Sequence, residues 1–122
     1  MHAGEAMPMV PQSVSVKDAL FEITSKKLGI TGVSNEAGAL IGVFTDGDLR
    51  RAIEKDINYL SQTIKTHMSA NPKRILRTNL AAKALQRMEE NSITSLFVFE
   101  TEEDSQPTGI IHLQDLLKAG VV

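Results

Sequence analysis

The segment Thr45-Asp46-Gly47-Asp48 holds the side chains best suited to chemistry on a small ligand. It follows an apolar run typical of a strand and opens a stretch with helical spacing. If Asp46 caps that helix, free backbone N–H groups at Gly47 and its neighbours form an anion site. The Thr45 hydroxyl can then donate to a phosphate oxygen, and the Asp48 carboxylate can accept from both hydroxyls of a ribose diol. An acidic first turn also stabilises a helix that binds nothing, so the segment alone leaves both interpretations open.

Other kinds of chemistry find little support in the sequence. The three histidines, His2, His67 and His112, are scattered and lack metal-ligand spacing. No phosphate-binding GxxxxGK loop occurs, and no serine lies in a nucleophile elbow. The absence of cysteine excludes disulfides, thiolate zinc sites and cysteine nucleophiles. We therefore expect no catalytic residue, no metal site and no required cofactor in this chain.

The composition indicates an ordinary globular domain. The chain has 122 residues, of which 42% are hydrophobic and 23% charged, enough to bury one core without metal or disulfides. Thirteen basic and fifteen acidic residues give a net charge of -2, so bulk attraction to nucleic acid or an anionic membrane is not expected. No apolar run approaches a bilayer span and no secretory signal opens the chain, which favours a cytoplasmic location.

An internal repeat supplies the helices that flank the candidate segment. Apolar residues recur at helical spacing in two stretches 65 positions apart: Val16, Ala19, Leu20 and Ile23, then Ala81, Ala84, Leu85 and Met88. Ser15, with Asp18 three residues later, is a capping-box-like start for the first helix, and Asn79 is the expected N-cap of the second.

The repeat continues in the strands and in the helices that follow them. Two strand-like runs begin with Ile-Thr, at 30–34 and at 93–98, with an offset of 63. Each leads through a polar turn to a second strand, at 40–45 and at 108–112. Both second strands run directly into a helix that carries Asp-Leu, at Asp48 and at Asp115, with an offset of 67. The chain therefore predicts two β-α-β-β-α units.

This repeat, which ends in Gly-apolar-apolar-Thr-x-x-Asp-Leu, resembles the CBS domain, named after cystathionine β-synthase. Such domains occur in pairs, so the resemblance implies an α+β fold of tandem CBS domains. Their two units would be related by a pseudo-twofold axis and packed sheet to sheet, with clefts between them. Residues 1–6 are expected to be a tail or linker remnant, 7–56 the first motif, 57–68 a connecting helix and 69–122 the second motif.

Three shorter stretches resemble the C-terminal part of D-arabinose 5-phosphate isomerases: TDGDLRR at 45–51, HLQDLLKAGVV at 112–122 and HAGEAMP at 2–8. In that family a sugar-isomerase domain precedes the CBS pair, and the enzyme supplies the precursor of Kdo for lipopolysaccharide or capsule. The resemblance implies that the natural protein begins further upstream and that this chain is its regulatory part, not an enzyme. It would act on its own sugar-isomerase domain and associate as a homodimer, or as a tetramer in the parent.

The resemblance also implies a nucleotide-like ligand. CBS domains in general imply AMP or ATP, whereas the narrower resemblance implies CMP-Kdo as a feedback end product. The alternative is a purely structural module that holds the parent oligomer together and binds nothing.

By analogy with CBS relatives, Thr45 takes the phosphate role and Asp48 the ribose role. Apart from that analogy, Arg50 or Arg51 could offset phosphate charge, although at least one of them is expected to be a solvated surface residue of the helix. Strand backbone and apolar side chains would enclose a base. In the second copy His112 replaces the threonine and Gln114 the glycine, while Asp115 is retained, so the two clefts are expected to be unequal, with the first the better nucleotide site. The candidate ligand-binding residues are Thr31, Gly32, Val33, Ser34, Thr45, Asp46, Gly47, Asp48 and Arg50 in the first copy, and Thr94, Ser95, His112 and Asp115 in the second.

Overall fold

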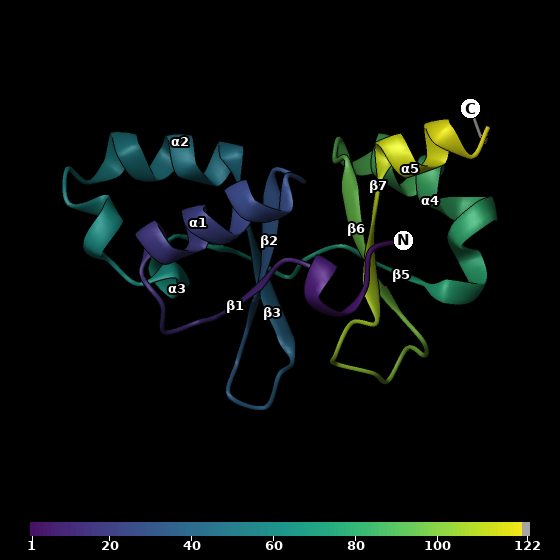
Figure 1. Cartoon of the computed structure of the whole chain (residues 1–122), viewed down its shortest axis with the longest axis horizontal. Coiled ribbons are helices and arrows are strands. Elements are labelled where there is room, and N and C mark those ends of the chain that lie inside the picture. The colour runs from purple at the N-terminus through teal and green to yellow at the C-terminus, as the bar shows by residue number, and fades with distance from the viewer. Residues whose placement is uncertain (121–122) are drawn as a thin grey trace. The chain divides into compact units, whose positions relative to one another are not determined.

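The computed structural model describes residues 1–120, including all side chains except those of residues 81 and 82 (Figure 1). The chain forms two compact units. The first unit comprises Pro8–Pro72, and the second joins Met1–Met7 to the residues from Lys73 onward. Both units combine helices with a sheet, which confirms the predicted α+β class.

The first unit is built on a four-stranded sheet of order β1-β2-β3-β4. Strand β1 is parallel to β2, and the other neighbouring pairs are antiparallel. Its elements in chain order are β1 (Met9–Pro11), α1 (Val16–Lys26), β2 (Ile30–Ser34), β3 (Leu40–Thr45), α2 (Asp46–Lys55), the 3-10 turn η2 (Tyr59–Ser61), α3 (Ile64–His67) and β4 (Ser69–Ala70). The segment 57–68, expected to be a connecting helix, thus contains a turn and one short helix.

Helix α1 forms where the apolar spacing predicts it, and its start is capped as expected. The Ser15 hydroxyl accepts a hydrogen bond from the Asp18 backbone N–H at 3.2 Å. The helix ends at Lys27, which adopts the left-handed conformation at φ 61°. Its buried face packs against the sheet in a core formed by Val10, Val16, Ala19, Ile23, Val33, Phe44 and Ile64.

The second unit repeats this plan around a sheet of order β5-β6-β7, with β5 parallel to β6 and β7 antiparallel to it. Its elements are the 3-10 turn η1 (Gly4–Ala6), β5 (Arg74–Leu76), the 3-10 turn η3 (Arg77–Asn79), α4 (Leu80–Asn91), β6 (Ser95–Phe99), β7 (Gly109–His112) and α5 (Leu113–Lys118). The core contains Ile75, Ala84, Met88, Leu96, Val98, Ile111 and Leu116. The side chain of Ala81, part of the predicted apolar spacing, lies outside the described residues.

Asn79 precedes α4 as predicted, but its side chain makes no capping hydrogen bond. The residue belongs to the turn η3, and the Leu80 N–H is satisfied by the carbonyl of Arg77. A backbone turn therefore leads into this helix in place of the side-chain cap that the sequence suggested.

The strand ladders correct the alignment of the two copies. Ile30 pairs with Thr45, and Ser95 pairs with His112, so Ser95 is the counterpart of Ile30. Strand β6 consequently begins at Ser95 and not at Ile93, and the true offset of these strands is 65, as for the preceding helices. The Ile-Thr match between the copies is a local coincidence, because the two extra residues of the second copy lie in its hairpin loop.

A segment from elsewhere in the chain borders the corresponding strand in each unit. In the first unit, β4 pairs with β3 and aligns Ser69 with Val43. In the second, His2 forms an antiparallel bridge with Ile110, the counterpart of Val43. Residues 1–6, expected to be a tail or linker remnant, supply this contact.

The close approach of these segments explains two glycines at equivalent positions. A Cβ atom on Gly42 would lie 2.9 Å from the Ser69 carbonyl oxygen, and one on Gly109 would lie 2.8 Å from that of His2. Real side chains do not pack so closely, so only glycine leaves room for the bordering segment at both places.

Candidate functional site

The junction between β3 and α2 holds the predicted segment, with one correction. Thr45, not Asp46, is the N-cap of α2, and Asp46 is its first helical residue. The Thr45 hydroxyl accepts from the Asp48 N–H at 3.3 Å, and the Asp48 Oδ2 accepts from the Thr45 N–H at 2.9 Å. This reciprocal capping box needs an acceptor three residues after the cap, which Asp48 gives to Thr45 but Leu49 cannot give to Asp46.

The Asp48 carboxylate is the most constrained polar group at this junction. The residue is 4% exposed, and both of its oxygens are fully engaged. Oδ2 also accepts from the Thr45 hydroxyl at 3.2 Å. Oδ1 accepts from the Ser69 hydroxyl at 2.6 Å and from Nη2 of Arg51 at 2.5 Å. A buried carboxylate requires such partners, and here they come from the helix itself, its cap and strand β4.

Asp48 has two contacts that the sequence did not predict, with Ser69 and with Arg51. Ser69 lies 21 positions from Asp48, and only the pairing of β4 with β3 brings them together. The sequence predicts that Arg50 or Arg51 offsets phosphate charge, and only Arg50 is among the predicted ligand-binding residues. The structure places Arg51 against Asp48, whereas Arg50 is an exposed residue of α2.

The strand β2 runs beside this junction, but its residues differ in how close they lie to Thr45. Ile30 pairs directly with Thr45. Thr31 and Val33 share one strand face, and Val33 belongs to the helix-covered core. Thr31 is fully buried, and its hydroxyl donates to the carbonyl of Gly32 at 3.1 Å. Ser34 stands at the far end of the strand, about 13 Å from Ile30 at the usual rise per residue.

The second unit carries a corresponding junction between β7 and α5. His112 is the N-cap, and its Nδ1 accepts from the Gln114 N–H at 3.1 Å. The Asp115 Oδ2 accepts from the His112 N–H at 2.8 Å, which reproduces the first junction. The Asp115 Oδ1 lies 3.2 Å from Nε2 of His2. A ring nitrogen of His112 thus caps α5 where a hydroxyl caps α2.

The surroundings of Asp115 act on its ionisation in opposite directions. Burial raises the pKa of Asp115, but the backbone N–H of His112, the imidazole of His2 and the ammonium group of Met1 together lower it by more. The net result is a pKa below the ordinary value of an aspartate. The charged form of Asp115 is therefore the one that the folded second unit favours.

The other two predicted residues of the second unit lie at the start of β6. Thr94 is exposed, and its carbonyl accepts from the Leu113 N–H at 2.7 Å. Ser95 is buried opposite His112 in the ladder. Within the part of the chain that the structure describes, the Ser95 hydroxyl is a buried polar atom without a hydrogen-bond partner.

A separate hollow of about 310 Å³ lies in the second unit, away from the predicted residues. Its two arginines already have partners in the protein. Arg74 donates to the Asp104 carbonyl at 2.6 Å and stacks over Phe99, with its guanidinium carbon 3.5 Å from the ring centre. Arg87 donates to the carbonyl of Arg74. The hollow is lined by Arg74, Ile75, Leu76, Arg87 and Glu102.

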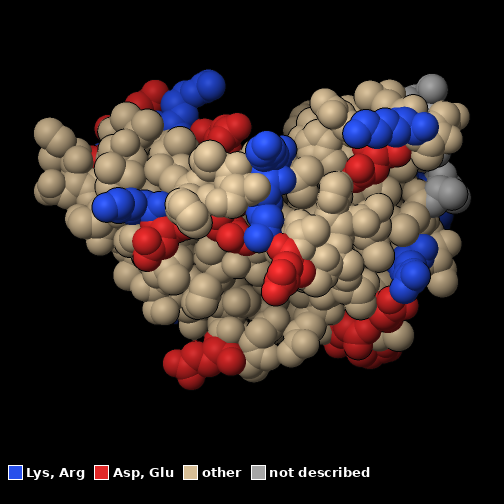
Figure 2. Space-filling model, in the orientation of Figure 1, with Lys and Arg blue, Asp and Glu red and all other residues tan. Residues whose placement is uncertain are grey.

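The rest of the described chain offers few other sites. Among residues 1–120, no three His, Asp or Glu side chains lie close enough together to hold a metal ion. No helix in that range is long and apolar enough to cross a membrane. On the face drawn in Figure 2, acidic and basic side chains are interspersed, in keeping with the small net charge.

Comparison with known families matches this pair of units to the CBS domain twice, at residues 3–55 and 63–122. The chain belongs to the CBS domain family. Two CBS domains thus account for nearly all of the sequence, as predicted.

Relatives and solved structures agree with this assignment. Arabinose 5-phosphate isomerase KdsD of Pseudomonas aeruginosa is 44% identical over all 122 residues, and the CBS pair spans 37% of its length. This confirms the predicted resemblance to the C-terminal region of these isomerases. A CBS-domain-containing protein of Agrobacterium tumefaciens superposes with a TM-score of 0.81 and 25% identity, covering 93% of this chain and 89% of its own. CBSX2, solved in complex with AMP, superposes with a TM-score of 0.83 and 22% identity. The superposition covers 99% of this chain and 92% of CBSX2.

Proposed function

We propose that this CBS pair is the ligand-sensing, regulatory region of a D-arabinose 5-phosphate isomerase, and that its first unit binds a nucleotide at the β3–α2 junction. The likeness to the isomerase over the whole chain supports the parent enzyme. The AMP-bound structure of CBSX2 supports the ligand class. The sugar-isomerase domain of the parent would be the partner that the CBS pair regulates.

One contact carries the assignment of the site. The Asp48 Oδ1 accepts a hydrogen bond from the Ser69 hydroxyl at 2.6 Å. This carboxylate oxygen is therefore placed to accept from an alcohol, which is the interaction that a ribose hydroxyl requires. The capping box fixes the carboxylate without using a flexible loop, so the acceptor is pre-organised.

The remaining groups fit a phosphorylated nucleoside. The first turn of α2 has backbone N–H groups and the positive end of the helix dipole for a phosphate. Gly47 keeps the backbone accessible there, and Thr45 caps the turn. Arg51 offsets the negative charge that Asp46 and Asp48 would otherwise present to the phosphate. The start of β2, at Ile30, would offer an apolar surface to the base.

The ligand class contains three candidates, AMP, ATP and CMP-Kdo. All three bring a ribose and a phosphate, so the same acceptor and helix start serve each of them. Regulation by CMP-Kdo would place the chain in Kdo synthesis for lipopolysaccharide or capsule, in a cytoplasmic enzyme. The pseudo-twofold relation of the units and the ligand contacts of the second unit stay predictions from the sequence.

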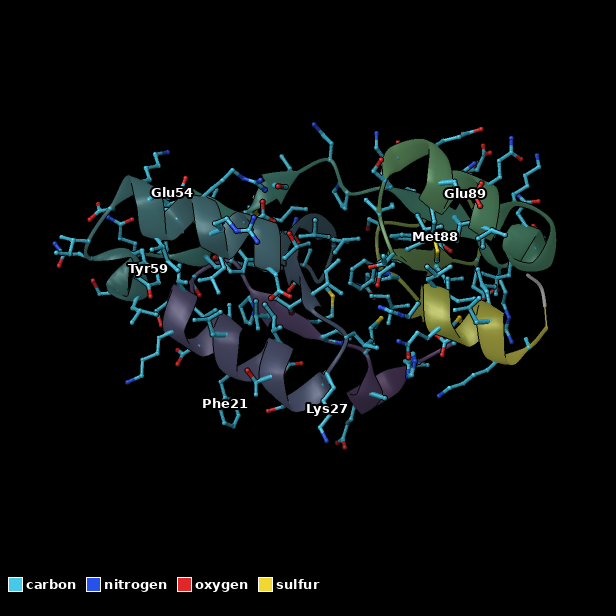
Figure 3. All side chains as sticks on the ribbon, turned by 90° about the horizontal axis from the view of Figure 1, so that it is seen from above. Phe21, Lys27, Glu54, Tyr59, Met88 and Glu89 are labelled. Atoms are coloured by element: carbon cyan, nitrogen blue, oxygen red, sulfur yellow. The ribbon has the colours of Figure 1, made fainter. Side chains whose placement is uncertain are left out.

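A structural role in oligomerisation is the second candidate, favoured by exposed apolar side chains in the first unit. Phe21 is 75% exposed on α1, and Ile57 is 91% exposed after α2. Figure 3 shows Phe21 projecting outward from its helix. Where such side chains form a contiguous patch, they mark a surface that associates with another protein.

A thermal-shift panel separates the two functions. The chain is heated with AMP, ATP, CMP-Kdo and, as a control, inorganic phosphate. A ligand at a hundred times its Kd should stabilise the fold by about 2.7 kcal/mol. If none of the nucleotides changes the melting temperature, the ligand-sensing proposal is wrong and the structural role remains.

A further inference from the structure

The acceptor capacity of Asp48 is already full. A carboxylate has about four lone-pair sites, two on each oxygen. Oδ2 accepts from the Thr45 N–H and the Thr45 hydroxyl, and Oδ1 accepts from the Ser69 hydroxyl and the Arg51 guanidinium. A ribose diol brings up to two further donors, and each hydroxyl that binds Asp48 has to take the place of a present donor.

Arg51 is the donor that can leave at the lowest cost. The Thr45 N–H contact is part of the capping box that starts α2, so losing it disrupts the helix, and the Thr45 hydroxyl is held beside Oδ2 because it accepts from the Asp48 N–H. Ser69 is fixed by the pairing of β4 with β3. The Arg51 side chain is 68% exposed and reaches Asp48 by folding back one turn along its own helix. Water can solvate its guanidinium as soon as it moves away.

The position of the Arg51 guanidinium links its departure to the arrival of an anion. A Cβ atom on Gly47 would lie 3.6 Å from both Nη1 of Arg51 and Oγ1 of Thr45. The cation therefore lies over the first turn of α2, where the helix dipole is positive. Once Arg51 loses Asp48, its charge is unfavourable there unless a phosphate binds beside it.

We infer that Arg51 is the residue that makes this site select phosphorylated nucleosides over unphosphorylated ones, an inference that rests on the proposed nucleotide function. In the ligand-free chain Arg51 occupies Asp48 and competes with the ribose diol. A nucleoside displaces this arginine and leaves only water to replace the lost contact with Asp48. A nucleotide displaces it and then binds it through the phosphate, with charge-assisted hydrogen bonds.

The test compares AMP with adenosine by isothermal titration calorimetry. The variants are Arg51→Ala and, as a control of equal charge change on the same helix, Lys55→Ala, an exposed residue in the last turn of α2. In the wild type, AMP should bind at least about tenfold more tightly than adenosine, the strength of one charged hydrogen bond. Arg51→Ala should strengthen adenosine binding, weaken AMP binding and bring the two Kd values within about threefold of each other. Lys55→Ala should keep the wild-type ratio.

Each other outcome has a distinct meaning. If the wild type binds neither AMP nor adenosine, the proposed function is wrong, and the role of Arg51 falls with it. If the wild type binds both and the ratio of Kd values is the same in Arg51→Ala, the nucleotide site stands and only the role of Arg51 is wrong. If Lys55→Ala lowers the ratio as much as Arg51→Ala, the preference comes from overall charge, which also overturns the inference.

Discussion

The β3–α2 and β7–α5 junctions share one backbone arrangement and differ in the side chains around it. In both, an aspartate at the third helical position accepts the N–H of the cap residue, at 2.9 Å for Asp48 and 2.8 Å for Asp115. In the first unit the cap and the bordering segment contribute hydroxyls, from Thr45 and Ser69. In the second they contribute imidazoles, from His112 and His2.

This substitution pattern separates what the fold requires from what the ligand requires. The aspartate is needed to start the helix in either unit, so its presence twice says little about binding. A hydroxyl is small and can be exchanged for a ribose hydroxyl, whereas an imidazole is larger and can carry a charge. The comparison therefore favours nucleotide binding in the first unit over binding in the second. The first unit also has Gly47 in the first turn of its helix, which keeps the backbone accessible.

The largest expected difference between the junctions is in nucleotide affinity. Asp48→Asn keeps an oxygen for the capping box but removes the negative charge of the acceptor that we propose for the ribose diol. We expect AMP affinity to fall about a hundredfold, the upper range for hydrogen bonds to a charged group. Asp115→Asn should leave AMP affinity unchanged, because we place the nucleotide in the first unit. A change of up to about twofold counts as unchanged, since it corresponds to little free energy. Calorimetric titration of both variants measures the difference, and equal losses would contradict the unequal sites.

The sequence predicts the elements of both junctions but not all of their contacts. Thr45 and Asp48 are three residues apart at a strand-to-helix boundary, so local spacing is enough to bring them together. Ser69 and His2 reach their aspartates only because distant segments pair beside β3 and β7. No local pattern signals such pairing.

The misplaced start of β6 has a similar origin. A shared Ile-Thr suggested an offset of 63, while the ladder to His112 fixes Ser95 as the counterpart of Ile30. Loop length in the hairpin decides this register, and a short sequence match contains no information about it.

The next largest expected difference is in stability, and it concerns the segments that border β3 and β7. Gly42→Ala would force its Cβ against the Ser69 carbonyl of the paired strand β4. We expect a loss of about 2 kcal/mol, typical of overpacking at a site that cannot relax. Gly109→Ala meets a segment joined by the single bridge at His2, which can move away, so we expect about 1 kcal/mol. Urea unfolding curves of both variants provide the comparison, and a larger loss for Gly109→Ala would show that residues 1–7 are the more rigid segment.

The starts of the equivalent helices α1 and α4 give a smaller contrast. Ser15→Ala removes the hydroxyl that accepts from the Asp18 N–H and should cost about 1 kcal/mol. Asn79→Ala removes a side chain that makes no capping bond, so its effect should stay within about 0.5 kcal/mol. Thermal unfolding of the two alanine variants tests this, and a cost for Asn79→Ala equal to that for Ser15→Ala would mean that both helices depend on side-chain caps.

The smallest expected effect concerns acid stability at the second junction. His2→Ala removes one of the groups that lower the pKa of Asp115, leaving burial, which raises it, and the His112 N–H and the Met1 ammonium, which lower it. The pKa of Asp115 should therefore rise towards its ordinary value. A carboxylate with a depressed folded pKa stabilises the fold above its unfolded pKa of about 3.9 and loses that contribution as the pH falls through the folded value.

The wild type should consequently retain this contribution to a slightly lower pH than His2→Ala. NMR titration of the Asp115 carboxyl carbon measures the shift directly, and acid unfolding at constant salt measures its effect on stability. Ser69→Ala is the matched control, because it removes the bordering contact of Asp48 in the first unit and no titrating group. Superposable Asp115 titration curves for the wild type and His2→Ala would show that the imidazole in the bordering segment has no electrostatic role, and the two junctions would then differ only in shape.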